Sequence, residues 1–268
     1  MLFVLSPAKT LDYTSPIPAV IGTPPAFQKR AAELVSLLRA ISPADLASLM
    51  TISDQLAQLN AQRFTEWSVR NSRSNSRPAV LAFDGDVYDG LQARSMTPTQ
   101  LLYLQSHLRI LSGLYGLLRP LDSIQPHRLE MSTRLANTAG ANLYAFWGDA
   151  VTAKLRSALI GKEQRTIVNL ASEEYFKAVR PTLLKANVIT PVFEDWHEGR
   201  YRVISFFAKR ARGAMVRYAA TRAIVAPHQL QDFRGEDYAF DAASSDVTTW
   251  RFRRAAVSKR DQVKPTDS

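Results

Sequence analysis

The stretch that most restricts how this chain can fold is 108–131, which reads LRILSGLYGLLRPLDSIQPHRLEM. It is too apolar for a surface loop, yet Gly113 and Gly116 interrupt it. Glycines at such positions suit a backbone with positive φ, or a close approach by another segment. The stretch also carries three arginines at intervals, Arg109, Arg119 and Arg128. These arginines fit either the wall of a cleft that holds anions or a core connection with ordinary salt bridges.

Short apolar runs followed by helix signals predict a mixed α/β fold. Residues 2–5 are apolar and end at Ser6-Pro7, which predicts a buried strand. Residues 166–170 predict a second strand, and Ser172 then caps a helix. Such strand-to-helix turns often hold ligands in α/β proteins. Apolar side chains recur on one face over residues 142–160, which predicts a single amphipathic helix.

Two short helices near the amino terminus form a predicted hairpin. Ser42 and Pro43 start a helix over residues 43–50, and Ser53 caps a longer one. This outline matches a helix-hairpin-helix unit, which offers backbone amides and a helix amino terminus to a DNA phosphate. Glycine is usual in that hairpin, and here Ser53 stands in its place. A plain αα-hairpin therefore stays open as an alternative.

The charge of the chain favours a polyanionic partner. It has 34 Lys+Arg against 24 Asp+Glu, a net charge of +10. Residues 199–231 contain seven basic residues and no acid, and they predict a strand at 201–207 and a helix over 207–222. Lys209, Arg210 and Arg212 flank the first turn of that helix, where cations oppose the helix dipole. Both a polyanion site and a basic solvated face explain this placement.

Several functions are excluded or unsupported. The chain has no cysteine, so it has no disulfide, thiolate metal site or thiol redox switch. Its four histidines are dispersed, and no phosphate-binding or dinucleotide-binding glycine motif occurs, so we expect neither a metal nor a cofactor. There is no signal-peptide pattern and no apolar run of membrane-spanning length, so we expect a cytoplasmic protein without membrane contact.

Six separated motifs carry a family resemblance. They are 6–12 (SPAKTLD), 49–54 (LMTISD), 83–90 (FDGDVYDG), 111–120 (LSGLYGLLRP), 169–177 (NLASEEYFK) and 208–213 (AKRARG). Together, in this order, they closely resemble the YaaA family of bacteria, also called the DUF328 or UPF0246 family. The likeness spans nearly the whole chain, to about residue 254.

The resemblance implies a role in the response to peroxide, where family members help limit free intracellular iron. It also implies one α/β unit of unusual topology over residues 1–255, with a polar tail at 256–268. The unit would contain a helix-hairpin-helix element at about 43–64 and a basic cleft that binds duplex and branched DNA. On this resemblance some of the following residues would contact DNA: Lys9, Ser53, Arg109, Arg119, Arg128, Lys177, Lys209, Arg210 and Arg212.

We therefore expect a monomeric, non-enzymatic DNA-binding protein whose affinity depends on phosphate contacts and salt. A rival is an enzyme for a phosphorylated or nucleic-acid substrate at residues 169–177, with Lys9 nearby and Glu173 or Glu174 as acid or base. A third possibility is direct iron binding, which needs Asp, Glu and His ligands that the sequence does not visibly group.

Overall fold

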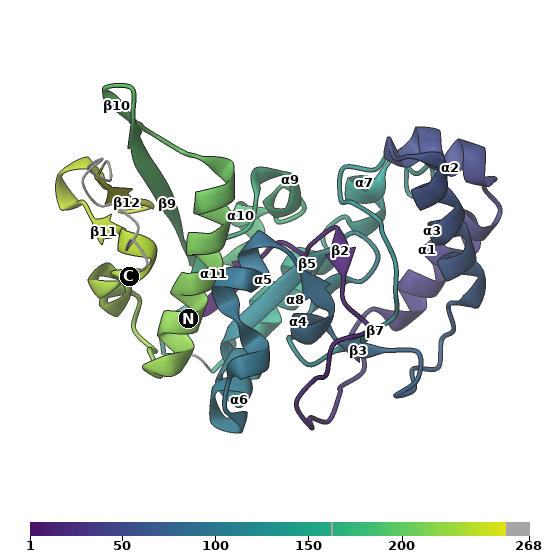
Figure 1. Ribbon diagram of the computed structural model, residues 1–268, viewed down its shortest axis with the longest axis horizontal. Coiled ribbons are helices and arrows are strands. Elements are labelled where there is room, and N and C mark those ends of the chain that lie inside the picture. Colours follow the sequence, from purple (N-terminus) through teal and green to yellow (C-terminus); the bar gives the residue numbers. More distant parts are fainter. Residues whose placement is uncertain (162, 256–268) are drawn as a thin grey trace, which may run out of the picture.

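A mixed β-sheet runs through the middle of the protein, in the order β11-β12-β9-β8-β1-β5-β6, with β10 beside β9. The computed structural model describes residues 1–161 and 163–255, and the tail expected at 256–268 lies outside them. Strands β12, β9, β8, β1 and β5 are parallel, whereas β6, β10 and β11 run antiparallel to their neighbours. The sheet is flanked by helices, so the expected mixed α/β fold is confirmed (Figure 1).

The strands are β1 (Leu2–Leu5), β2 (Thr10–Leu11), β3 (Arg77–Pro78), β4 (Phe83–Asp84), β5 (Leu108–Ser112), β6 (Gly116–Leu118), β7 (Ser123–Ile124), β8 (Thr166–Asn169), β9 (Asn187–His197), β10 (Arg200–Arg202), β11 (Ala239–Phe240) and β12 (Thr249–Arg254). The α-helices are α1 (Gln28–Arg39), α2 (Pro43–Met50), α3 (Asp54–Glu66), α4 (Ala79–Ala82), α5 (Asp86–Leu91), α6 (Pro98–His107), α7 (Leu143–Trp147), α8 (Ala150–Ala158), α9 (Glu173–Phe176), α10 (Pro181–Leu184) and α11 (Ser205–Thr221). Short 3-10 helices are η1 (Ala93–Ser95), η2 (Pro227–Asp232), η3 (Gly235–Asp237) and η4 (Ala242–Ser244).

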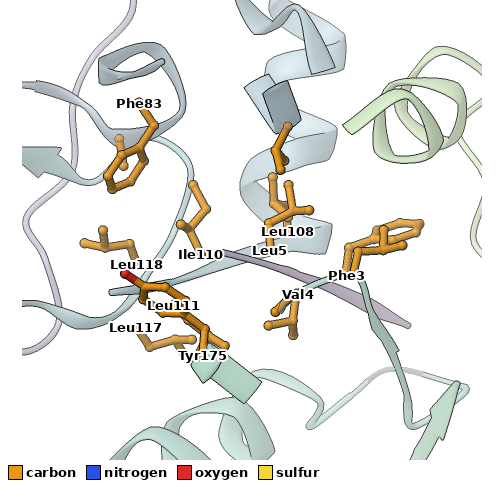
Figure 2. Close-up of a cluster of buried hydrophobic side chains, with 14 of the residues drawn as sticks. Phe3, Val4, Leu5, Phe83, Leu108, Ile110, Leu111, Leu117, Leu118 and Tyr175 are labelled. Atoms are coloured by element: carbon orange, nitrogen blue, oxygen red, sulfur yellow. The ribbon is translucent and has the colours of Figure 1, made fainter. Parts of the chain in front are cut away.

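Strand β1 lies at the centre of the sheet, between β8 and β5. All four of its residues are buried, as expected of a parallel strand covered on both faces. Figure 2 shows Phe3, Val4 and Leu5 next to side chains of β5 and β6, with Phe83 on one side of the sheet and Tyr175 on the other. The predicted strand at 2–5 is confirmed, and it anchors the hydrophobic core.

Helices α5, α6 and α11 pack together on one face of the sheet, and α8 packs with α10 on the other (Figure 1). The contact of α5 with α11 passes through two glycines. A Cβ atom at Gly90 would lie 2.0 Å from Arg210 O, and one at Gly213 would lie 1.7 Å from Val87 O. Only glycine permits so close an approach of two backbones. Helices α1, α2 and α3 lie apart from this group, at the opposite end of the molecule from β11 and β12 (Figure 1).

Two sequence-based boundaries are wrong. The single helix predicted over 142–160 is two helices, because Gly148 takes φ 47° and breaks the chain direction between α7 and α8. The strand predicted over 201–207 ends at Arg202, and α11 already begins at Ser205. No helix among the described residues is long and apolar enough to cross a bilayer.

Candidate nucleic-acid interface

The predicted helical hairpin is present and is made of α2, a three-residue turn and α3. The Ser42 side chain accepts a hydrogen bond from Asp45 N at 3.2 Å, and Ser53 accepts one from Leu56 N at 3.4 Å, so both predicted caps are confirmed. Thr51 takes the left-handed conformation (φ 52°, ψ 56°) that glycine commonly takes at a helix end. A β-branched residue therefore holds a backbone conformation that favours glycine.

The hairpin is fixed to the centre of the fold by the residue that ends α3. Trp67 donates from Nε1 to the Tyr115 hydroxyl at 2.9 Å, and both side chains are buried. Gln125 N donates to the same hydroxyl at 3.2 Å. The glycine-containing stretch 108–131 thus holds the position of the hairpin as well as that of the sheet.

A hollow of about 620 Å³ lies where the hairpin meets the basic residues that follow β1 and β7. Residues 48–51 form one wall of it, at the end of α2. The charged residues that line it are Lys9, Arg128, Arg134 and Glu130. Three cations and one carboxylate therefore face the same space as the hairpin turn. We call this the hairpin pocket.

Glu130 organises two of these cations. Lys9 Nζ lies 2.9 Å from Glu130 Oε2, and Arg128 Nη2 lies 3.0 Å from Glu130 Oε1. The Arg134 side chain is exposed and makes no ion pair within residues 1–161 and 163–255. The buried Nε atom of Arg128 likewise has no hydrogen-bond partner in the described part of the chain. The pocket thus keeps donor capacity that Glu130 does not use.

Gly113 explains how Arg128 and Glu130 reach this position. A Cβ atom at Gly113 would lie 2.2 Å from Leu129 O, so the chain at 128–130 crosses directly over the end of β5. The expectation of a close backbone approach at Gly113 is confirmed. Gly116 has φ 66° and lies under the Trp147 ring, which confirms the other expectation, positive φ.

Lys9 is positioned by the turn after β1. Ser172 N donates to Ser6 Oγ at 2.8 Å, and Ser6 Oγ lies 3.2 Å from Ser172 Oγ. This contact joins the carboxyl ends of β1 and β8, between which the strand order reverses direction. Ser172 begins α9 as predicted, but its hydroxyl does not cap the helix, because it pairs with Ser6 instead.

The other candidate residues lie elsewhere. Ser53 caps α3, and Lys177 Nζ lies 5.1 Å from the centre of the Tyr144 ring. Lys209 is 3.7 Å from Asp86, and Arg210 is 3.0 Å from Glu236. Arg212 is half-buried, and desolvation lowers the pKa of its guanidinium. Arg109 and Arg119 face a second pocket beside β5 and β6. Of the nine candidates, Lys9 and Arg128 line the hairpin pocket.

Sequence reasoning missed Arg134. It stands in the segment Ser132-Thr133-Arg134, outside the six motifs, and no local pattern distinguishes it from a surface arginine. The signal that identifies it is spatial, since it faces the hairpin across the pocket. Among the described residues, no group of three or more His, Asp or Glu side chains is placed to hold a metal ion.

Comparison with known proteins places the chain in a family. The family model described as "Peroxide stress protein YaaA" matches residues 1–244. The chain belongs to the YaaA family. A UPF0246 protein of Janthinobacterium sp. (strain Marseille) is 60% identical over 254 residues, which cover 95% of this chain and 98% of the relative. A UPF0246 protein of Ralstonia nicotianae is 57% identical, and the match covers 96% of this chain and 100% of the relative. A UPF0246 protein of Burkholderia ambifaria is 56% identical, and the match covers 95% of this chain and 98% of the relative.

The YaaA match confirms the resemblance that the six motifs indicated, and it extends over all of them. Membership of a peroxide stress family is therefore established for this chain. The names of the relatives say nothing about DNA or iron.

Proposed function

We propose that this YaaA protein is a non-enzymatic DNA-binding protein of the peroxide response, which protects DNA and helps limit free intracellular iron. The observation that carries the DNA part is that the hairpin turn faces Lys9, Arg128 and Arg134 across one pocket. Hairpin backbone groups and arginines are the donors that commonly contact DNA phosphates. The iron part rests on the family resemblance.

Binding of this kind is dominated by phosphate contacts, so it is weakly dependent on sequence and strongly dependent on salt. The net charge of +10 draws a polyanion toward the protein, and the pocket supplies directed donors. Glu130 limits the pocket's charge, since its carboxylate neutralises part of Lys9 and Arg128. A Glu130→Gln variant is accordingly expected to bind DNA more tightly than the parent.

The test is a fluorescence-anisotropy titration of labelled duplex and junction DNA over a range of salt concentrations. The variant is Lys9→Gln/Arg134→Gln, because both side chains are exposed and their loss leaves the core intact. Two lost phosphate contacts reduce the slope of log affinity against log salt by about two. The matched control is Arg156→Gln/Arg165→Gln, which removes the same charge from exposed positions outside the pocket. Equal slopes for variant and control would refute the proposed interface.

Charge reversal at Lys209, Arg210 and Arg212 is a poorer test. Lys209 and Arg210 already pair with Asp86 and Glu236, and Arg212 is half-buried. Glutamates there would place like charges together and disturb the packing of α11, so a loss of binding would not be specific.

An enzyme that acts on a phosphorylated or nucleic-acid substrate is the second candidate function, and one observation favours it. The Ser6–Ser172 contact lies between the carboxyl ends of β1 and β8, where ligands of open α/β sheets commonly bind. Against it, the Glu174 carboxylate accepts hydrogen bonds from Ser132 N and Oγ, and so is already occupied. Release of phosphate or cleavage of DNA by the parent, abolished in Ser6→Ala, would favour the enzyme.

A further inference from the structure

A second basic pocket lies at the opposite ends of the strands from the hairpin pocket. It has a volume of about 360 Å³, and its cations are Arg109, Arg119 and Lys154. Arg109 is the second residue of β5, whereas Ser112 at the other end of that strand lies beside Lys9 and Arg128. Three residues of extended chain span roughly 10 Å, so the two pockets are separate.

Strand pairing brings two of these cations together. Ile110 of β5 pairs with Leu118 of β6 in an antiparallel register, so Arg109 and Arg119 occupy the next opposing positions. Lys154 comes from α8, which packs on β6. Two strands and a helix thus direct positive charge into one concavity, whose remaining lining is mainly apolar and small: Ala26, Leu117, Leu118, Ser157 and Ala158.

One acid faces this pocket among the described residues, and it is already satisfied. Asp122 is buried, and its carboxylate accepts three hydrogen bonds. The donors are Arg119 N at 2.8 Å, Arg119 Nε at 3.0 Å and Thr23 Oγ1 at 2.6 Å. It neutralises about one positive charge. Three cations and one carboxylate leave the pocket with an excess of about two charges, which is the charge of an ionised phosphate monoester.

Arg109 has hydrogen-bond donors that the described chain does not use. Its Nη1 donates to the carbonyl oxygens of Gln105 and Leu108, at 3.0 and 2.6 Å, whereas its Nε and Nη2 make no hydrogen bond within the described chain. Burial, and to a smaller extent the positive charge of Arg119, lower the pKa of Arg109 to about 10. Two guanidinium groups therefore repel each other across a pocket that has room for an anion between them. The ammonium of Lys154 is exposed at the rim and has no ion pair within residues 1–161 and 163–255.

We propose that the pocket formed by Arg109, Arg119 and Lys154 binds a phosphate monoester. A monoester has three terminal oxygens and nearly two negative charges, and arginine forks and a lysine ammonium are its usual partners. The same group occurs on a free nucleotide and at a 5′ end of DNA. This site does not depend on the hairpin pocket binding DNA, because the two pockets have different cations.

The test is isothermal titration calorimetry of the full chain with adenosine 5′-monophosphate, with adenosine as the ligand control. Lys154→Gln is the variant, because this side chain is exposed and its replacement leaves the fold intact. Loss of one charge-assisted contact weakens binding by about tenfold or more. Arg156→Gln, on the same helix but outside the pocket, retains the parent affinity. Lys9→Gln/Arg134→Gln also retains it, so failure of the DNA proposal leaves this one standing.

The proposal is overturned if the nucleotide gives no saturable binding, if adenosine binds equally well, or if Lys154→Gln and Arg156→Gln behave alike. A competition arm then identifies the source of the phosphate. Displacement of the nucleotide by a 5′-phosphorylated duplex, and not by the same duplex with 5′-hydroxyl ends, assigns the pocket to DNA ends. Displacement by neither duplex assigns it to free phosphorylated molecules. Equal displacement by the two duplexes would overturn the proposal, because it would mean that the pocket binds the phosphodiesters of the DNA backbone and not a phosphate monoester.

Discussion

Replacing Thr51 by glycine is expected to stabilise the protein, although the change removes a side chain. Thr51 is held at φ 52° and ψ 56°, where a residue with a Cβ atom costs about 1–2 kcal/mol. Glycine takes this conformation without strain, but it raises the conformational entropy of the unfolded chain, which lowers stability by roughly 0.5–1 kcal/mol. The Thr51 side chain is exposed and makes no hydrogen bond in the part of the chain that the structure describes, so no contact is lost. Thr51→Gly should therefore raise the free energy of unfolding by about 0.5–1 kcal/mol.

The measurement is urea unfolding followed by circular dichroism, with thermal unfolding beside it. For a chain of this size we expect the melting temperature to rise by about 1–4 °C. Ser48→Gly is the matched control, because Ser48 is exposed in right-handed helix in the last turn of α2, where glycine lowers stability by about 0.5 kcal/mol. If Thr51→Gly lowers stability as Ser48→Gly does, the left-handed turn carries no strain and the reasoning is refuted.

Two further predictions concern the core. Burial lowers the pKa of His127 to about 4 from an ordinary 6.5, so between these pH values the unfolded chain holds a proton that the folded chain does not. The free energy of unfolding should therefore fall by about 3 kcal/mol as pH drops through that window, which urea unfolding at each pH measures. The fall should be absent in His127→Gln and present in the control His228→Gln, whose histidine is exposed. Gly116→Ala should cost about 3 kcal/mol, because its Cβ atom would lie 2.7 Å from the Trp147 ring at φ 66°. Gly161→Ala, at φ 78° with nothing within 4 Å, should cost about 1–2 kcal/mol, and equal losses at the two glycines would contradict the steric part.

Local signals in the sequence predicted local structure well. The apolar run of β1 and the caps at Ser42 and Ser53 depend on neighbouring residues alone, and the structure confirms them. The break at Gly148 was missed because apolar periodicity continues across it from α7 into α8. The start of α11 was missed because its N-cap, Ile204, has no side chain able to cap a helix.

The sites depend on contacts between distant segments, and so the sequence predicted them less well. Lys9 and Arg128 are brought together by the parallel pairing of β1 with β5 and by the close approach at Gly113. Arg109 and Arg119 lie opposite each other because of the register between β5 and β6, and the sequence of the turn that joins these strands does not specify that register. These four cations were already candidates from the sequence, whereas Arg134 and Lys154 required the three-dimensional arrangement.

The central place of β1 has a consequence for synthesis on the ribosome. During synthesis β1 leaves the ribosome about 100 residues ahead of its partner β5, and β8 follows later still. At roughly 5–20 residues per second, this apolar strand waits about 5–20 s for its first neighbour. Helices α1, α2 and α3 have local contacts and can form during that interval. The apolar strand β1 is therefore open to aggregation until residue 169 has emerged and the strand has both its neighbours.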